Sequence, residues 1–365
     1  MDLSKAFDTV NHEILISKLE NYGVRGLALN WFKSYLSNRK QFVSYNYEKS
    51  NEQSIRCGVP QGSILGPLLF IIYINDISYT SDIVSFCLFA DDTSLVYSHK
   101  NVDTATQIFN IELDKISIWL LANKLCINLL KSNYMIFCPR QHKYSQSIPL
   151  VLNGVNLNPV TNTKFLGVII DENLTWKKHV SEISTKLSRT IGILNRLKVF
   201  IPRDILVILY NSFVLPYLNY SVLTWFSSSV NCDKLFLLQK RAVRIIVNAG
   251  YRDHTANLFA KLKNLKFKDL YSLNLGKFMF KYMHNSLPDC FSSCFTLTSN
   301  IHSHNTRSAS RKNIHVCYNR TSLFKNSLIQ RGVNYWNSLS ESIKKSSSLA
   351  IFASKLKQQL LEAYL

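Results

Sequence analysis

Two adjacent aspartates, Asp91 and Asp92, are the residues of this sequence whose types and spacing most directly indicate chemistry. They follow an apolar, strand-forming run, residues 86–90, and precede a second β-prone run, residues 95–97, so the pattern predicts a hairpin with both carboxylates at its tip. Two adjacent carboxylates repel each other unless a cation is held beside them. We therefore interpret the pair as a divalent-metal site, and an Asp-Asp turn that only closes a hairpin is the alternative.

A third carboxylate and a glycine-rich loop lie elsewhere in the first half of the chain. Asp2 comes just before apolar residues at helical spacing, residues 7–19, and Gly23 ends that predicted helix. The loop covers residues 58–67, where glycines let the backbone approach a ligand closely and the Gln61 amide can both donate and accept. Such a loop before a helix suits contact with a nucleotide or a nucleic-acid strand, although a plain turn before a buried helix has the same composition.

The elements that must position these groups are a mixture of helices and strands, which predicts an α+β fold. Further helices are predicted over residues 27–36, 68–76 and 103–124. Strands are predicted over residues 42–47, 54–57, 148–152 and 165–170. The segment 127–137 is predicted to pass from a loop that holds Lys131 into another strand. The strands come from distant parts of the chain, so the tertiary structure must bring them together.

After Asp171 the pattern changes to almost continuous helix. Thr175 is predicted to cap the first of these helices, and Pro202 is predicted to open a second helix that Pro216 bends or ends. The second half of the chain is therefore expected to be a separate helical region.

Positive charge is concentrated in this helical half. The chain carries 43 Lys and Arg against 23 Asp and Glu; residues 1–170 contribute +2 to the net charge of +20, and residues 171–365 contribute +18. A helix predicted over residues 235–247 has one apolar face and one basic face, and the basic face consists of Lys240, Arg241 and Arg244. This asymmetry indicates contact with a phosphate backbone, and a solvated basic face without a ligand is the alternative.

The cysteines indicate a reducing compartment. The chain has eight, and none of them forms a close C-x-x-C pair, so we expect an intracellular protein, with the nucleus and the cytoplasm equally compatible. A zinc site is one hypothesis for the cluster Cys290, Cys294, His302 and His304, and local packing of Phe291 and Phe295 is the other. Neither a signal peptide nor a membrane-spanning segment is predicted, and the sequence indicates no protein partner.

The three carboxylates, the glycine-rich loop and Lys131 form one ordered constellation. Three carboxylates from two distant segments are what a two-metal phosphoryl-transfer site needs. The constellation resembles the palm motifs of reverse transcriptases, most closely those of LINE-like non-LTR retrotransposons of the Jockey and CR1 type. The motifs that carry the resemblance are Asp2-Leu-Ser-Lys-Ala-Phe-Asp8, Gly58-Val-Pro-Gln-Gly-Ser-Ile-Leu-Gly-Pro-Leu-Leu-Phe70, Tyr73-Ile-Asn-Asp76, Phe89-Ala-Asp-Asp92 and Phe165-Leu-Gly167.

The resemblance implies a role for each matching residue near the chemistry. Asp2 and Asp91 would be the main metal ligands, with Asp92 as the second acid of its motif. They would hold two Mg²⁺ ions, for which Mn²⁺ could substitute. Phe7 would be the aromatic steric gate that excludes a ribonucleotide 2′-hydroxyl, and Lys131 would protonate the departing pyrophosphate.

The resemblance also implies how the substrates are held. Gln61 and Gly62 would position the templating base and the incoming deoxynucleoside triphosphate. An RNA template and a DNA primer would be the nucleic-acid partners. The primer grip would consist of Phe165, Leu166 and Gly167, and the backbone contacts of the thumb would come from Lys240, Arg241 and Arg244.

We therefore expect a reverse transcriptase palm with a small antiparallel sheet over residues 1–171, a helical thumb-like region over 172–250 and a basic helical C-terminal region over 251–365. The fingers that precede the first aspartate in such enzymes are expected to be missing, which makes the chain an N-terminally truncated form in which no strand supports Asp2. The expected function is RNA-directed DNA polymerase. The alternative is a catalytically inactive remnant that only binds nucleic acid.

Overall fold

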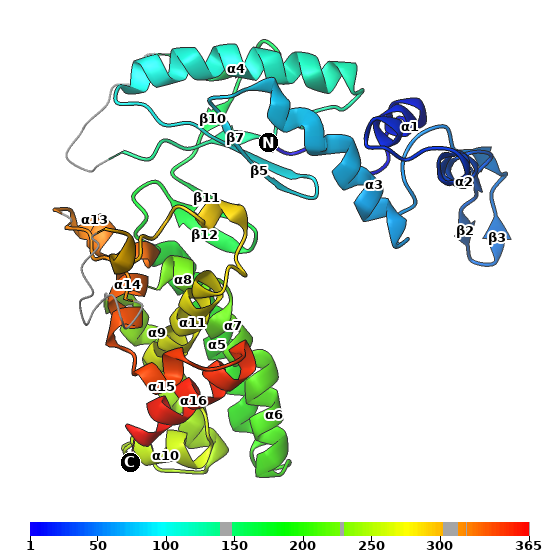
Figure 1. Cartoon of the computed structure of the whole chain (residues 1–365). Coiled ribbons are helices and arrows are strands. Elements are labelled where there is room, and N and C mark those ends of the chain that lie inside the picture. Colours follow the sequence, from blue (N-terminus) through cyan, green and yellow to red (C-terminus); the bar gives the residue numbers. More distant parts are fainter. Residues whose placement is uncertain (139–147, 227–229, 302–312, 319, 365) are drawn as a thin grey trace. The chain divides into compact units, whose positions relative to one another are not determined.

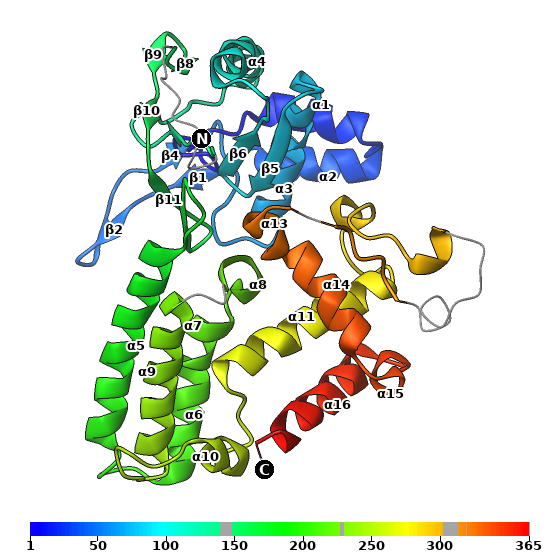
Figure 2. The same cartoon turned by 90° about the vertical axis from the view of Figure 1, so that its left-hand side faces the viewer.

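The computed structural model describes residues 1–138, 148–226, 230–301, 313–318 and 320–364, and it separates into two compact units, Met1–Thr163 and Lys164–Leu365 (Figure 1). The first unit combines helices with two-stranded sheets, and helices dominate the second (Figure 2). These element types confirm the α+β class. Within the described ranges, no helix is both long enough and apolar enough to cross a lipid bilayer.

The first unit contains helices α1 (His12–Asn21), α2 (Leu27–Leu36), α3 (Leu65–Ile74) and α4 (Val102–Ala122), with the 3₁₀ helix η1 (Asn75–Thr80) after α3. Its antiparallel strand pairs are β1 (Lys40–Gln41) with β4 (Gln53–Ser54), β2 (Ser44–Tyr45) with β3 (Glu48–Lys49), β5 (Ser85–Phe89) with β6 (Asp92–Val96), and β8 (Val151–Leu152) with β9 (Val155–Asn156). Strands β7 (Asn133–Tyr134) and β10 (Asn158–Pro159) pair in parallel.

Helix α3 is central to the core of the first unit because it is apolar on every side. Its Leu69, Phe70 and Tyr73 are fully buried. Leu15 of α1 and Ile116 of α4 belong to the same core and are also fully buried. Each such side chain stabilises the fold by about 1.5–3 kcal/mol through removal of apolar surface from water, which fixes α1 and α4 against α3.

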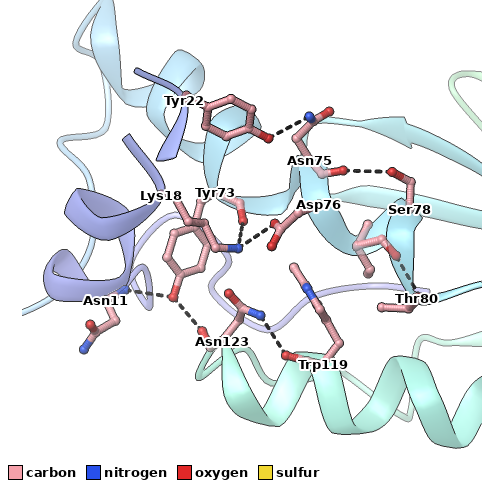
Figure 3. Close-up of polar contacts among 11 residues, drawn as sticks. Asn11, Lys18, Tyr22, Tyr73, Asn75, Asp76, Ser78, Thr80, Trp119 and Asn123 are labelled. Carbon is pink, nitrogen blue, oxygen red and sulfur yellow. Dashed lines mark hydrogen bonds and ion pairs between the residues drawn. The ribbon is translucent and has the colours of Figure 1, made fainter. Parts of the chain in front are cut away.

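A polar network reinforces the same three helices (Figure 3). The Lys18 ammonium donates to the Tyr73 carbonyl and to Asp76 Oδ1, both at 2.6 Å, and it lies 4.7 Å from the centre of the Trp119 ring. The Tyr73 hydroxyl donates to the Asn123 carbonyl at 2.6 Å. Burial lowers the pKa of Lys18, and the hydrogen bond and charge of Asp76 oppose that effect. A half-buried cation is tolerated here because it has partners from two other elements.

The second unit begins with β12 (Val168–Asp171), which pairs with β11 (Asn162–Phe165), a strand that crosses the boundary between the units. Helices follow: α5 (Lys177–Leu197), α6 (Arg203–Phe213), α7 (Leu215–Asn219), α8 (Val222–Trp225), α9 (Val230–Ile246), α10 (Ala256–Lys261), α11 (Phe267–Met283), α13 (Ser322–Lys325), α14 (Leu328–Ser338), α15 (Glu341–Lys344) and α16 (Leu349–Glu362), with 3₁₀ turns η2 (Asp289–Phe291) and η3 (Thr298–Asn300).

Long helices build the core of the second unit. Helix α5 packs against α9 and α6, and α11 packs against α14 and α16 (Figure 2). A buried amide joins the two groups: Gln239 of α9 donates to the Tyr210 hydroxyl at 3.0 Å and accepts from the Phe267 N–H at 2.8 Å. Because both partners satisfy the amide, it fixes the register of α6, α9 and α11 without leaving an unpaired polar group.

The structure differs from the prediction at the start of two helices. The first helix begins at His12, because the Asn11 side chain accepts from the Ile14 N–H and ends the turn that contains Phe7. Helix α5 begins at Lys177 with Trp176 at the N-cap position, and neither Thr175 nor another side chain caps it. Asp171 accepts from the N–H groups of Thr175 and Trp176 and so stabilises the turn that precedes the helix.

Three predicted strands also differ from the structure. The segment 165–170 is a hairpin, because Leu166 and Gly167 have φ of 44° and 81° and reverse the chain. The segment 42–47 ends within a hairpin of its own, so β2 pairs with β3 and not with the strand predicted over 54–57. The strand expected within 127–137 is reduced to β7, two residues long. Period-two patterns do not reveal where a strand reverses.

Candidate active site

The hairpin of β5 and β6 places the two adjacent aspartates differently, as its register shows. Phe89 pairs with Asp92, so Ala90 and Asp91 form the two-residue turn, and Ala90 has φ of 52°. Asp91 lines a cleft in the first unit, whereas Asp92 begins β6, is exposed and lies outside the lining of that cleft. The predicted hairpin with acids at its tip is confirmed, with Asp91 in the turn and Asp92 as the first residue of β6.

Asp2 is supported on both sides, contrary to the expectation that no strand would hold it. Its backbone bridges Asp92 on one side, and the next residue, Leu3, bridges Ile127 on the other. The Asn128 N–H donates to the Asp2 carbonyl at 2.8 Å, and the Asp2 N–H donates to Ser132 Oγ at 3.1 Å. The segment therefore acts as a short strand between the hairpin and residues 126–132.

The cleft has a volume of about 510 Å³ and collects most of the predicted catalytic residues. Asp2 and Asp91 line it together with Lys131, and the Lys131 ammonium lies 3.9 Å from Asp2 Oδ2. The Lys131 side chain is 71 % exposed and that of Asp2 34 %, so water reaches this ion pair and it contributes little to stability. The remaining lining residues are Leu3, Ser4, Lys5, Ala6, Phe7, Gln61 and Asn128.

The glycine-rich loop packs directly on the segment that contains Phe7. The N–H groups of Gly58 and Val59 donate to the carbonyls of Val10 and Phe7 at 2.7 and 2.8 Å. Gly58 has φ of +87°, and a Cβ there would lie 2.8 Å from the Asp8 carbonyl oxygen. Only glycine fits this approach without strain. The contact places Gln61 at the cleft, while Gly62, also at positive φ, is not part of the lining.

Three residues of this region have contacts that the sequence interpretation missed. Gln61 donates to Asp8 Oδ1 at 2.7 Å, His12 Nε2 lies 2.8 Å from the Gly58 carbonyl, and Lys18 belongs to the network of Figure 3. Asp8 and His12 therefore support the loop, and Lys18 supports the helices beneath it. The contact of Asp8 with the loop could have been predicted from its position directly after Phe7, because a side chain next to a cleft residue can reach the loop that faces it.

The donor set of the cleft fits a hard divalent cation. Among the described residues, no group of three or more His, Cys, Asp or Glu side chains is placed to hold a metal by itself. Asp2 and Asp91 nevertheless offer two carboxylates to one open cavity. Mg²⁺ commonly binds through one or two carboxylates and takes its other ligands from phosphate and water. The cleft therefore suits a metal that arrives with a phosphorylated substrate.

The predicted primer grip and backbone contacts lie in the second unit. Leu166 and Gly167 form the turn after Phe165, where the Tyr220 hydroxyl donates to the Leu166 carbonyl at 2.6 Å. The three basic residues lie on α9 and have different surroundings. Arg241 is exposed, and the Lys240 ammonium lies 4.3 Å from the centre of the Phe236 ring. Arg244 donates twice to the Asp253 carbonyl. Leu237 of the same helix is 62 % exposed, so the apolar side chains of α9 do not all lie on its buried face.

The zinc hypothesis falls partly outside the described residues, because His302 and His304 lie there. Of the other two members, Cys294 Sγ lies 3.8 Å from the Cys290 carbonyl. The Phe278 ring packs against those of Phe291 and Phe295, with centroids 5.3 and 6.4 Å away. These ring contacts are the local packing that was considered as the other explanation.

Comparison with known proteins finds a family match over the residues of the first unit that form the cleft. Residues 1–170 match the family model described as reverse transcriptase (RNA-dependent DNA polymerase). Residues 1–170 form a reverse transcriptase domain. The cleft, with Asp2 and Asp91, and the glycine-rich loop all lie within this domain.

The similarity extends beyond the reverse transcriptase domain. The chain is 29 % identical over 269 residues, 69 % of its length, to the probable RNA-directed DNA polymerase from transposon BS of Drosophila melanogaster. It is 29 % identical over 283 residues, 74 % of its length, to the RNA-directed DNA polymerase from mobile element jockey of the same species. A Pol polyprotein from type-1 retrotransposable element R1 of Bradysia coprophila is 22 % identical over 68 % of this chain. The matches span 29, 30 and 25 % of these relatives' own lengths.

Proposed function

We propose that this chain provides the polymerase region of an RNA-directed DNA polymerase of a non-LTR retrotransposon, which adds deoxynucleoside triphosphates to a primer 3′-hydroxyl on an RNA template. The observation that carries the proposal is the cleft in which Asp2 and Asp91, from segments far apart in the chain, meet beside Lys131. The reverse transcriptase domain and the names of the relatives support it.

In the proposed mechanism Asp2 and Asp91 would hold the metal, with Asp92, whose backbone bridges that of Asp2, as a further acid. Two Mg²⁺ ions bound there, or Mn²⁺ in their place, would supply charge that stabilises the attacking and leaving oxygens. Lys131, 3.9 Å from Asp2, donates a proton to the departing pyrophosphate. The exposure of this lysine leaves its ammonium free to turn toward a bound triphosphate.

The proposed substrate contacts use the rest of the cleft. The Phe7 ring is held against the Phe70 ring, with centroids 4.6 Å apart, and serves as the steric gate toward the sugar. Gln61 and Gly62 position the base pair that forms. In the second unit, the turn Phe165–Gly167 contacts the primer, and the basic side chains of α9 contact phosphates. Residues 1–171, 172–250 and 251–365 correspond in this proposal to the palm, the thumb and a basic C-terminal region.

Primer extension on an RNA template tests the proposal. The whole chain is assayed with Mg²⁺ and deoxynucleotides beside the Asp91→Asn and Asp82→Asn variants; Asp82 is an exposed carboxylate of the same unit, outside the cleft. We expect Asp91→Asn to lower the extension rate at least about a hundredfold, because a charge that the transition state needs is removed. Asp82→Asn loses the same charge and should extend normally.

RNA binding and primer extension, measured together in the same variants, separate the two candidate functions. Asp91→Asn should bind RNA as well as or better than the unchanged chain, because a carboxylate near phosphates is removed. Extension that is absent from the unchanged chain, or equal in the chain and in Asp91→Asn, would contradict the proposal and leave the catalytically inactive nucleic-acid-binding remnant as the function.

A further inference from the structure

The hairpin of β2 and β3 carries an unusual surface that the cleft does not use. We call residues 42–49 the aromatic hairpin (Figure 1). Its large side chains point into solvent: Phe42 is 48 %, Val43 70 % and Tyr45 76 % exposed, and Tyr47 is fully exposed. Within the described residues, no aromatic ring or cation packs on the rings of Tyr45 or Tyr47. Four large exposed side chains within six residues make this hairpin a candidate for a binding site.

The turn of the aromatic hairpin places a bulky residue where glycine is normally preferred. Asn46 and Tyr47 are its two central residues, with φ of 47° and 68°. Two-residue hairpin turns of this kind favour Asn-Gly, because the second position requires a left-handed backbone. A tyrosine there is strained, and such strain is typical of functional positions. The turn therefore does not need the ring of Tyr47. An interaction with a partner outside the hairpin better explains why a tyrosine stands at this position.

A cation lies beside one of these rings, and two more precede the hairpin. The Lys49 ammonium lies 5.0 Å from the centre of the Phe42 ring. The Arg39 guanidinium, just before the hairpin, lies 5.8 Å from the centre of the Tyr35 ring of α2. Lys40 pairs with Glu52 at 3.0 Å, and both side chains remain about 60 % exposed. Rings that can stack on bases, beside cations that can contact phosphates, are the features with which proteins bind unpaired nucleic-acid strands. A duplex would hide its bases from such rings.

We propose that the aromatic hairpin binds an unpaired RNA strand, whose bases stack on Tyr45 and Tyr47 and whose phosphates lie near Lys49. That this strand is the template ahead of the primer rests on the proposed function. The contact depends on ring faces and not on hydrogen bonds to base edges, so it is tolerant of sequence.

Affinity for an RNA overhang tests the hairpin separately from other basic surfaces. Fluorescence anisotropy without nucleotides compares two probes that share one RNA–DNA duplex, one blunt and one with a single-stranded RNA extension. The overhang preference is the ratio of the two dissociation constants. Tyr47→Gly removes the ring and relieves the strained turn, so the hairpin remains folded. We expect it to lower the overhang preference about fivefold to a hundredfold, the range for loss of one stacked base.

Two control variants define what the loss means. Tyr47→Phe keeps the ring and should keep the overhang preference. Tyr79→Ala removes another tyrosine of the first unit, 83 % exposed and on η1, outside the aromatic hairpin, and should also keep the overhang preference. An unchanged preference in Tyr47→Gly, or an equal loss in Tyr79→Ala, would overturn the proposal. Equal effects on DNA and RNA overhangs would support stacking, since every base has a ring face.

Photo-crosslinking locates the contact directly. An overhang that contains 5-iodouridine is irradiated on the whole chain, which is then cleaved with trypsin. Cleavage after Lys40 and Lys49 releases residues 41–49 as one peptide. We expect the crosslink on this peptide; crosslinks confined to other peptides would overturn the proposal. If the unchanged chain crosslinks on this peptide but does not extend a primer, the polymerase function is refuted and the RNA-binding hairpin still stands.

Discussion

The two compact units place their polar groups in different ways. In the first, the carboxylates of Asp2 and Asp91 line an open cleft, supported by short strands and by a loop packed on the Phe7 segment. In the second, long helices bury a large apolar core, and the polar groups inside it, such as Gln239, have hydrogen-bond partners. Arg241 and the other surface cations remain outside.

This difference separates the binding of charged substrates from the stabilisation of the fold. A site that must bind charged substrates keeps its ionised groups accessible to solvent. These groups are therefore not buried, and the cleft adds little to the free energy of unfolding. A helical unit that presents positive charge can derive its stability from apolar packing beneath the surface. Substitutions in the two units should therefore fail in different ways, either through lost chemistry or through lost folding.

The largest effect on folding is expected from the core of the second unit. Phe352 is fully buried, and its ring centre lies 4.7 Å from that of Phe280. Phe352→Ala should lower the free energy of unfolding by about 3–5 kcal/mol, because it removes buried surface and leaves a cavity. Urea denaturation measures this, and Phe200→Ala, at an 82 % exposed site, should have little effect. Equal destabilisation by both variants would mean that burial does not distinguish these sites.

A change of selectivity is expected from the gate of the first unit. Phe7→Val shortens a ring that lines the cleft and should let ribonucleotides compete at least about tenfold better, the scale of discrimination by a single steric group. Primer extension with mixed deoxynucleotides and ribonucleotides, followed by alkaline cleavage of the product, measures the ratio. Unchanged sugar selectivity would remove Phe7 from the role of gate.

Alkaline pH should destabilise the second unit through its buried tyrosines. Burial raises the pKa of Tyr335 to about 12 and also raises the pKa of Tyr210. In the unfolded chain tyrosine ionises near pH 10, so from about pH 10 upward the unfolded state binds fewer protons than the folded state. The second unit should then lose on the order of 1 kcal/mol per pH unit for a fully buried tyrosine. Denaturation from pH 9 to 11.5 measures the slope, which Tyr210→Phe should reduce; an unchanged slope would contradict this origin.

The smallest effect is expected from a single surface cation. Arg241→Gln should weaken RNA binding by a few-fold and reduce the slope of log affinity against log salt by about one, because one phosphate contact is lost. Titrations at several salt concentrations measure the slope. Lys357→Gln, an equal charge change on α16, serves as the control. Equal changes in both variants would indicate general attraction and not a contact made by α9.

The sequence by itself determined the local elements and the domain type. The bounds of α2, residues 27–36, follow from its apolar spacing and were predicted as observed. The hairpin around Asp91 was predicted from two β-prone runs and the turn between them, and the ordered motifs identified a reverse transcriptase domain. These features depend on residues close together in the chain, where backbone propensity and period are informative.

Only the tertiary structure decided how these elements form a site. The support of Asp2 depends on bridges to Asp92 and Ile127, which lie far away in the sequence. The choice of Asp91 as the cleft residue depends on a left-handed backbone at Ala90, and the fit of the loop depends on Gly58 meeting the backbone of Asp8. Local patterns carry no information about partners brought together by burial of a shared core, so these contacts follow from the packing around α3.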